Sequence, residues 1–257
     1  MANRGSHGPS VALLGSGEFE PWTDDVDQWL LDRATGDGTV LILPAASAPE
    51  GDNVFDMWAN MGLTHYGRLG NPAEVIPLKT RRDAERPGLA KPLSSASMAY
   101  FSGGNPAYLA GILRGTVFWS ELLTAMARGM AYTGCSAGIA CLGEIAPDSA
   151  VRDFTSKDIW KPGLRLFPRT QFGPHWDALD TYLPGLRRMI VSAVPDAWRL
   201  VAVDEDTALV GDGTLWQVVG SGGVHLWENA EWHDMAAGTS FTRPFEIALA
   251  PSETTQA

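Results

Sequence analysis

The feature that most constrains the fold is a succession of short apolar runs separated by segments with helical spacing. The runs are uniformly apolar rather than alternating, which predicts strands that are buried on both faces. Strands of this kind are typical of a parallel sheet covered by helices on both sides, so the pattern predicts an α/β fold. The predicted strands are 11–15, 39–46, 73–78, 97–101 and 130–133, and the predicted helices are 24–33, 52–61, 107 onward and 118–128.

The last third of the chain has a different pattern. Residues 200–210, 215–219 and 223–227 are strand-like and are joined by glycine turns, which predicts an antiparallel extension of the sheet. Residues 79–92 are charged and contain proline, so a surface loop with at most one helical turn is expected there. The length of 257 residues suits a single α/β domain over 1–257, with disordered tails at 1–9 and 251–257.

The net charge and the N-terminal sequence restrict the functions and the cellular location that we expect. A net charge of −11 argues against binding to nucleic acid or to a membrane surface, because both need clustered lysine and arginine. The polar start lacks the apolar stretch of a secretory signal, so we expect a cytoplasmic protein whose cysteines are reduced. Ten tryptophans are compatible with a homodimer interface, although most are expected in the core.

The segment Gly134-Cys-Ser-Ala-Gly138 matches the pattern G-x-S-x-G directly after a predicted strand. A sharp strand-to-helix turn makes such a serine stand out from the chain, and small neighbours prevent clashes. We therefore take Ser136 as a candidate nucleophile and the N–H of Ala137 as the first donor of an oxyanion hole. The alternative is a glycine-rich turn in which the serine is only structural.

A second glycine turn, Ser102-Gly-Gly-Asn105, follows the preceding predicted strand. Adjacent parallel strands would place it beside the first turn, at the carboxyl edge where open α/β sheets bind ligands. The N–H of Gly103 or Gly104 could then complete the oxyanion hole, and Asn105 is expected to contact the substrate. Asn105 is also a good N-cap for a helix that starts at Pro106.

A serine nucleophile needs a base and a carboxylate that orients the base. Of the five histidines, His175 follows a strand-like segment and can reach the carboxyl edge, whereas a structural role is the alternative. Three acids interrupt the apolar run 200–210, where unpaired charge would be costly, so one of them is a candidate orienter. The candidate carboxylates are Asp204, Glu205 and Asp206, with Asp148 and Asp153 as competitors.

Together these segments resemble peptidase family S51, the serine peptidases that include dipeptidase E and cyanophycinase. The order and spacing match over roughly residues 10–225. The resemblance rests on the opening segment 11–19, on Ser102-Gly-Gly-Asn105, on Gly134-Cys-Ser-Ala-Gly138, on Pro174-His175 and on Val203-Asp-Glu-Asp-Thr-Ala-Leu209.

The resemblance implies a class I glutamine amidotransferase-like fold, a three-layer α/β sandwich with a mostly parallel sheet. It implies Ser136 as nucleophile, His175 as base and no metal or organic cofactor. The acidic segment near residue 205 matches better than the one near residue 148, so Glu205 is favoured as the orienting acid. Cyanophycinase-like proteins carry arginines soon after the histidine, where this chain has the segment 176–182, and this difference leaves the substrate open.

The leading hypothesis is therefore a serine hydrolase, a peptidase or dipeptidase that acts on small peptides or amides through an acyl-enzyme on Ser136. One alternative is an esterase in which His225 or His233 is the base. Another is an amidotransferase-like enzyme that uses Cys135. The third is a non-catalytic, small-molecule-binding protein that has retained the fold.

Overall fold

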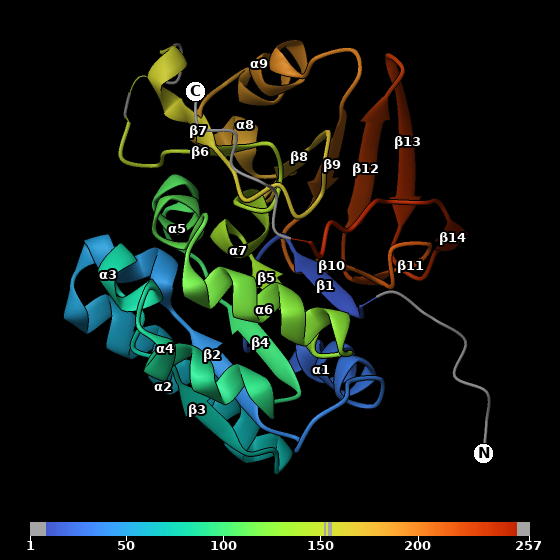
Figure 1. Ribbon diagram of the computed structural model, residues 1–257. Helices are drawn as coiled ribbons and strands as arrows, with labels where there is room; N and C mark the ends of the chain where they lie inside the picture. The colour runs from blue at the N-terminus through green and yellow to red at the C-terminus, as the bar shows by residue number, and fades with distance from the viewer. Residues whose placement is uncertain (1–8, 152, 154–155, 251–257) are drawn as a thin grey trace.

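The central feature of the fold is an eight-stranded sheet with the order β14-β11-β10-β1-β5-β4-β2-β3 (Figure 1). The computed structural model describes residues 9–151, 153 and 156–250, so the predicted tails lie almost wholly outside the described residues. The strands β1, β5, β4, β2 and β3 pair in parallel, as the apolar runs predict. Their bounds are β1 (Val11–Leu14), β2 (Val40–Leu43), β3 (Ala73–Val75), β4 (Met98–Phe101) and β5 (Ala131–Cys135).

The C-terminal third extends this sheet with antiparallel strands, which confirms the predicted extension at 207–210 and 215–219; the predicted strand 223–227 lies instead in a second sheet. The added strands are β10 (Thr207–Gly211), β11 (Leu215–Gly220) and β14 (Ser240–Thr242). A separate four-stranded sheet has the order β13-β12-β9-β8. It consists of β8 (Thr170–Gly173), β9 (Arg199–Val203), β12 (Gly223–Glu228) and β13 (Glu231–Ala236), and a small antiparallel pair is formed by β6 (Ile145–Pro147) and β7 (Trp160–Pro162).

The prediction of one strand over 200–210 was wrong. The strand β9 ends at Val203, and β10 begins at Thr207 in the other sheet. Between them the chain turns, and Asp206 adopts a left-handed conformation with φ 49°. Three consecutive acids cannot be buried in a strand ladder without partners. The chain therefore leaves one sheet at Asp204, which is bonded to His225 and to the Gly223 N–H, and enters the next sheet after the exposed Asp206.

Helices cover both faces of the main sheet, and alternate residues of β1 show the two layers. Ala12 and Leu14 pack in one apolar cluster with residues of α1 (Asp24–Leu31) and α2 (Asp52–Leu69). Val11 and Leu13 pack in the other cluster with residues of α5 (Pro106–Leu113) and α6 (Val117–Ala127). The parallel part of the sheet is thus the middle layer of a three-layer sandwich.

Two other segments differ from the sequence-based expectation. The helix α2 continues to Leu69, eight residues beyond the predicted end at 61, and ends at Gly70 in a left-handed conformation. Residues 79–92 contain two one-turn helices, the first with a capping box between Thr80 and Asp83. The remaining helices are α3 (Arg81–Ala84), α4 (Pro87–Ala90), α7 (Ala137–Ala140), α8 (Leu179–Tyr182) and α9 (Leu186–Ala193), with 3₁₀ turns at Pro21–Thr23, Ala45–Glu50, Lys91–Ser94 and Lys157–Ile159.

None of the helices within the described residues has the length and apolar character needed to cross a bilayer.

Candidate active site

The turn between β5 and α7 places Ser136 in a strained conformation. Its φ is 51° and its ψ is −105°, values that are rare for a residue with a side chain. The two flanking glycines permit this turn: a Cβ on Gly134 would lie 2.4 Å from the Gly138 carbonyl oxygen, and a Cβ on Gly138 would lie 2.4 Å from the Phe101 oxygen. The Ser136 N–H donates to the carbonyl of Leu14 (3.0 Å), which fixes the turn to the end of β1.

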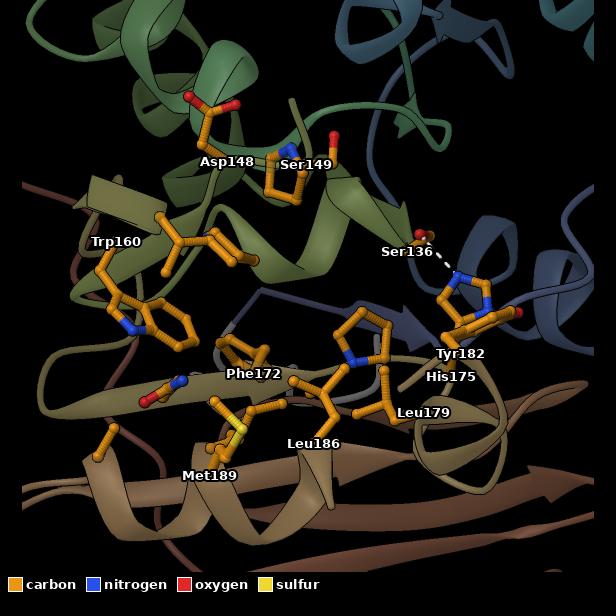
Figure 2. A pocket seen from close by; sticks show the side chains of 18 of the residues that line it. Ser136, Asp148, Ser149, Trp160, Phe172, His175, Leu179, Tyr182, Leu186 and Met189 are labelled. Atoms are coloured by element: carbon orange, nitrogen blue, oxygen red, sulfur yellow. Dashed lines mark hydrogen bonds between the residues drawn. The ribbon is translucent and has the colours of Figure 1, made fainter. Parts of the chain in front are cut away.

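Ser136, His175 and Glu205 form a continuous hydrogen-bonded chain. His175 Nε2 lies 2.9 Å from Ser136 Oγ, the interaction drawn as a dashed line in Figure 2. His175 Nδ1 lies 2.8 Å from Glu205 Oε1. When Nδ1–H donates to the carboxylate, Nε2 is left as the acceptor for the serine hydroxyl, which is the arrangement a general base requires.

The two loops that carry His175 and Glu205 are tied together. They follow the neighbouring parallel strands β8 and β9. The Glu205 N–H donates to Asp177 Oδ1 (2.9 Å), and the Trp176 N–H donates to the Val203 carbonyl (3.1 Å). The Tyr182 hydroxyl donates to Glu205 Oε1 at 3.3 Å. The carboxylate is therefore held in place by contacts from the same segment that carries the imidazole.

The expected oxyanion loop does lie beside the nucleophile, because Phe101 in β4 pairs with Gly134 in β5. The expectation for Gly103 needs correction: its N–H donates to the buried carboxylate of Glu18 (2.9 Å) and is not free for a substrate. Among the described residues, the N–H groups of Gly104 and Ala137 have no acceptor. These two donors are therefore the candidates for stabilising an oxyanion.

Asn105 also has a different role from the expected substrate contact. Its Oδ1 accepts the Tyr108 N–H (3.1 Å), as an N-cap does, and its Nδ2 donates to Asp148 Oδ1 (2.8 Å). Both ends of the side chain are thus engaged by the protein. Asp148 accepts a second bond from the Ala150 N–H and is not hydrogen-bonded to His175, whereas Asp153 is exposed.

The structure places the alternative bases away from Ser136. His225 lies between Asp234 (2.7 Å) and Asp204 (3.2 Å), and His233 is 3.9 Å from Glu228. His65 is buried against Asp27 at 2.7 Å, and His7 lies outside the described residues. Within the described chain, His175 is the histidine that reaches the serine.

The two cysteines are free and fully buried. Burial raises the pKa of the Cys135 thiol well above its usual range, and the negative charge of Glu18 raises it further. Burial likewise raises the pKa of Cys141. Neither thiol is set up as a nucleophile, because the thiolate is the reactive form.

Ser136 and His175 form part of the wall of a cavity of about 740 Å³. The rest of the wall is mostly apolar and is supplied by β8, α8, α9 and the strands β6 and β7. Figure 2 shows Ser136 and His175 at one end, Trp160 at the other, and Phe172, Leu186 and Met189 between them. The described residues contain no cluster of three or more side chains suited to hold a metal ion.

Sequence reasoning missed two residues at this site, Glu18 and Tyr182. Glu18 belongs to the opening segment that resembles the family, and this resemblance was the available signal. Tyr182 carried no local signal, because its contact with Glu205 depends on the fold of α8.

The model of peptidase family S51 matches residues 11–219. This chain belongs to peptidase family S51. Cyanophycinases from Synechococcus elongatus and from Thermosynechococcus vestitus are each 27% identical over 238 residues, which cover 86% of this chain and 68% of the relative. Because the members of this family are peptidases, the substrate of this chain is a peptide.

Solved structures show the same fold. A peptidase from an acI-B1 Actinobacterium is 29% identical and superimposes with a TM-score of 0.83, over 93% of this chain and 98% of the other. A putative peptidase E from Listeria monocytogenes EGD-e has a TM-score of 0.58 at 19% identity, over 83% of this chain and 98% of the other. The first likeness extends over nearly the whole of both chains, and the second concerns the fold alone.

Proposed function

We propose that the chain is a serine peptidase that cleaves small peptides through an acyl-enzyme on Ser136. The observation that carries the proposal is the hydrogen-bonded chain from Glu205 through His175 to Ser136. The positions of the three residues further support the proposal, because each residue follows the end of a different strand. The fold, and not the local sequence, brings them together.

In the proposed first step, His175 Nε2 takes the proton of Ser136 Oγ while the oxygen attacks the peptide carbonyl carbon. The negative charge that develops on the carbonyl oxygen is stabilised by the N–H groups of Gly104 and Ala137. As the intermediate collapses, the C–N bond breaks and His175 returns its proton to the departing amine. Glu205 holds the imidazole in one orientation and stabilises its cationic form.

The second step releases the acyl group. A water molecule gives a proton to His175 and attacks the ester carbonyl, and the bond to Ser136 Oγ then breaks as His175 protonates that oxygen. The products are a free carboxylic acid and the original enzyme. Apart from the water molecule, the groups that act in these steps are side chains and backbone N–H groups of the chain.

The experiment that tests the proposal is labelling with a fluorophosphonate probe, followed by mass spectrometry of the adduct. We expect labelling at Ser136 and its loss in Ser136→Ala and in His175→Ala. Hydrolysis of a small-peptide mixture should be lost in the same two variants. His225→Ala is the matched control and should retain both signals; loss of labelling in that variant and its retention in His175→Ala would overturn the assignment of the base.

A further inference from the structure

The cavity next to Ser136 is long and apolar rather than small and charged. Trp160 forms its far end, and Ile159, Phe172 and Leu179 contribute to its wall. Its volume of about 740 Å³ lies in the upper part of the range of about 300–1,000 Å³ that is usual for ligand sites. A substrate that fills it must bring considerable apolar surface.

Helix α9 gives the cavity its most regular wall. Leu186, Met189, Ile190 and Ala193 recur at the spacing i, i+3, i+4 and i+7, and all four line the cavity. Such a stripe normally packs against a protein core. Figure 2 shows Leu186 and Met189 projecting from this helix into the space opposite Trp160. Part of this stripe therefore faces the cavity instead of packing against another helix or strand.

A single buried amide stands out in this apolar wall. Gln171 in β8 is only 1% exposed and lines the cavity, yet its Oε1 has no hydrogen-bond partner among the described residues. A buried amide without a partner is destabilising, so its presence in a wall of apolar side chains requires a reason. A carboxamide offers one acceptor and two donors. It can therefore pair with a group that itself both donates and accepts, as a peptide bond does.

We infer that the cavity binds apolar peptides of three or more residues, and that Gln171 binds a backbone peptide group of the substrate. Gln171 lies in β8, and a turn leads from the end of this strand to His175. At about 3.3 Å per strand residue, Gln171 lies on the order of 10 Å from the catalytic centre. This span corresponds to about three extended residues of substrate. The inference rests on the proposed function and specifies its substrate.

The charged groups around the cavity agree with an apolar substrate. Lys157 and Arg188 are exposed, so they lie at the solvent side rather than in the apolar part. The Asp148 carboxylate is already bonded to Asn105. An acidic substrate side chain would lose its hydration in the apolar part of the cavity without gaining an opposite charge there, which is unfavourable.

The test is a series of leucine peptides from two to five residues, extended at either end, with kcat/KM measured for wild type, Gln171→Met and Gln217→Met. Gln217 is exposed on β11 and serves as the matched control. We expect kcat/KM to rise by about tenfold between the dipeptide and the tetrapeptide, the effect of one well-placed hydrogen bond. Gln171→Met should remove most of the rise, and the matched Gln217→Met should preserve the rise, dipeptide hydrolysis and the melting temperature.

Fluorophosphonate labelling of Ser136, run in parallel, separates this inference from the proposed function. Intact labelling without any gain from peptide length, or with a preference for aspartyl dipeptides or for N-acyl amides with one long chain, would overturn the inference alone. A rise that persists in Gln171→Met would overturn the role of that residue. Absence of labelling in the folded wild type would overturn the proposed function, and with it this inference.

Discussion

The buried carboxylate of Glu18 accepts the N–H of Gly103 at 2.9 Å. Its second oxygen accepts the thiol of Cys135 at 2.9 Å, one residue before the nucleophile. Glu18 is 6% exposed and so makes these contacts largely out of water, where hydrogen bonds to a charged acceptor are strong. One side chain therefore fixes the spacing between the loop that carries Gly104 and the turn that carries Ser136.

This geometry makes Glu18 a positioning residue for the oxyanion hole. Glu18→Ala should lower kcat by about 10- to 100-fold with little change in KM, somewhat less than the effect of deleting an oxyanion donor outright. Glu18→Gln keeps an acceptor for Gly103 and should retain more activity. Steady-state kinetics on a small peptide will check both. Equal losses in the two variants, or a change confined to KM, would contradict the positioning role.

Variants of the carboxylates at residues 148 and 205 test which acid orients His175. Glu205→Gln should reduce kcat by about 10³- to 10⁴-fold, because an amide no longer fixes the required imidazole tautomer. Asp148→Asn removes a charge that contacts Asn105 rather than His175, so its effect on kcat should be less than tenfold. Kinetics of the two purified variants decide the matter, and a larger loss in Asp148→Asn would assign the orienting acid to that position.

The glycines of the nucleophile turn allow a test of stability. A Cβ at Gly138 would lie 2.4 Å from a backbone oxygen, so Gly138→Ala should lower the free energy of unfolding by about 1–3 kcal/mol. Gly111 lies within α5 with open space around it, and Gly111→Ala should raise the free energy of unfolding by about 0.5–1 kcal/mol. Urea denaturation measures both, and a neutral Gly138→Ala would show that the turn can relax.

The parallel sheet and the nucleophile turn could be predicted from sequence because their signals are local. The run 130–133 and the glycines at 134 and 138 specify a strand and a sharp turn without reference to the rest of the chain. His175 and the acids at 204–206 were candidates from their positions alone, and the family resemblance favoured Glu205 among these acids. Their meeting depends on β8 and β9 pairing in parallel, which no local pattern specifies.

What could not be predicted depends on contacts between distant segments. The run 200–210 looked like one strand, although its two halves belong to different sheets. Both halves are equally buried, so the acids at 204–206 are the sequence feature that indicates the turn. Gly103 looked like a free donor because its acceptor, Glu18, lies 85 residues earlier. The cavity could not be anticipated either, because it is assembled from α9, β7 and β8.

The buried thiols give a prediction about reactivity. Burial raises the pKa of Cys135 and Cys141, so neither should react with a disulfide reagent in the native protein at about pH 8.5, where a free cysteine is half ionised. Both should react after denaturation. Cys135→Ser should stay labelled by fluorophosphonate at Ser136; its complete inactivation with folding intact would instead favour a cysteine nucleophile.

The same shifts predict a loss of stability at alkaline pH. A thiol whose pKa is higher in the folded state favours folding fully below the pKa of the unfolded state, about 8.5, and this contribution is lost as the pH rises above that value. Each thiol should therefore lower the free energy of unfolding by about 1.4 kcal/mol per pH unit above about 8.5. Denaturant unfolding between about pH 7 and pH 10 measures the slope. Cys141→Ala should show a shallower slope than wild type, whatever its stability at neutral pH, and an unchanged slope would mean that Cys141 ionises without unfolding.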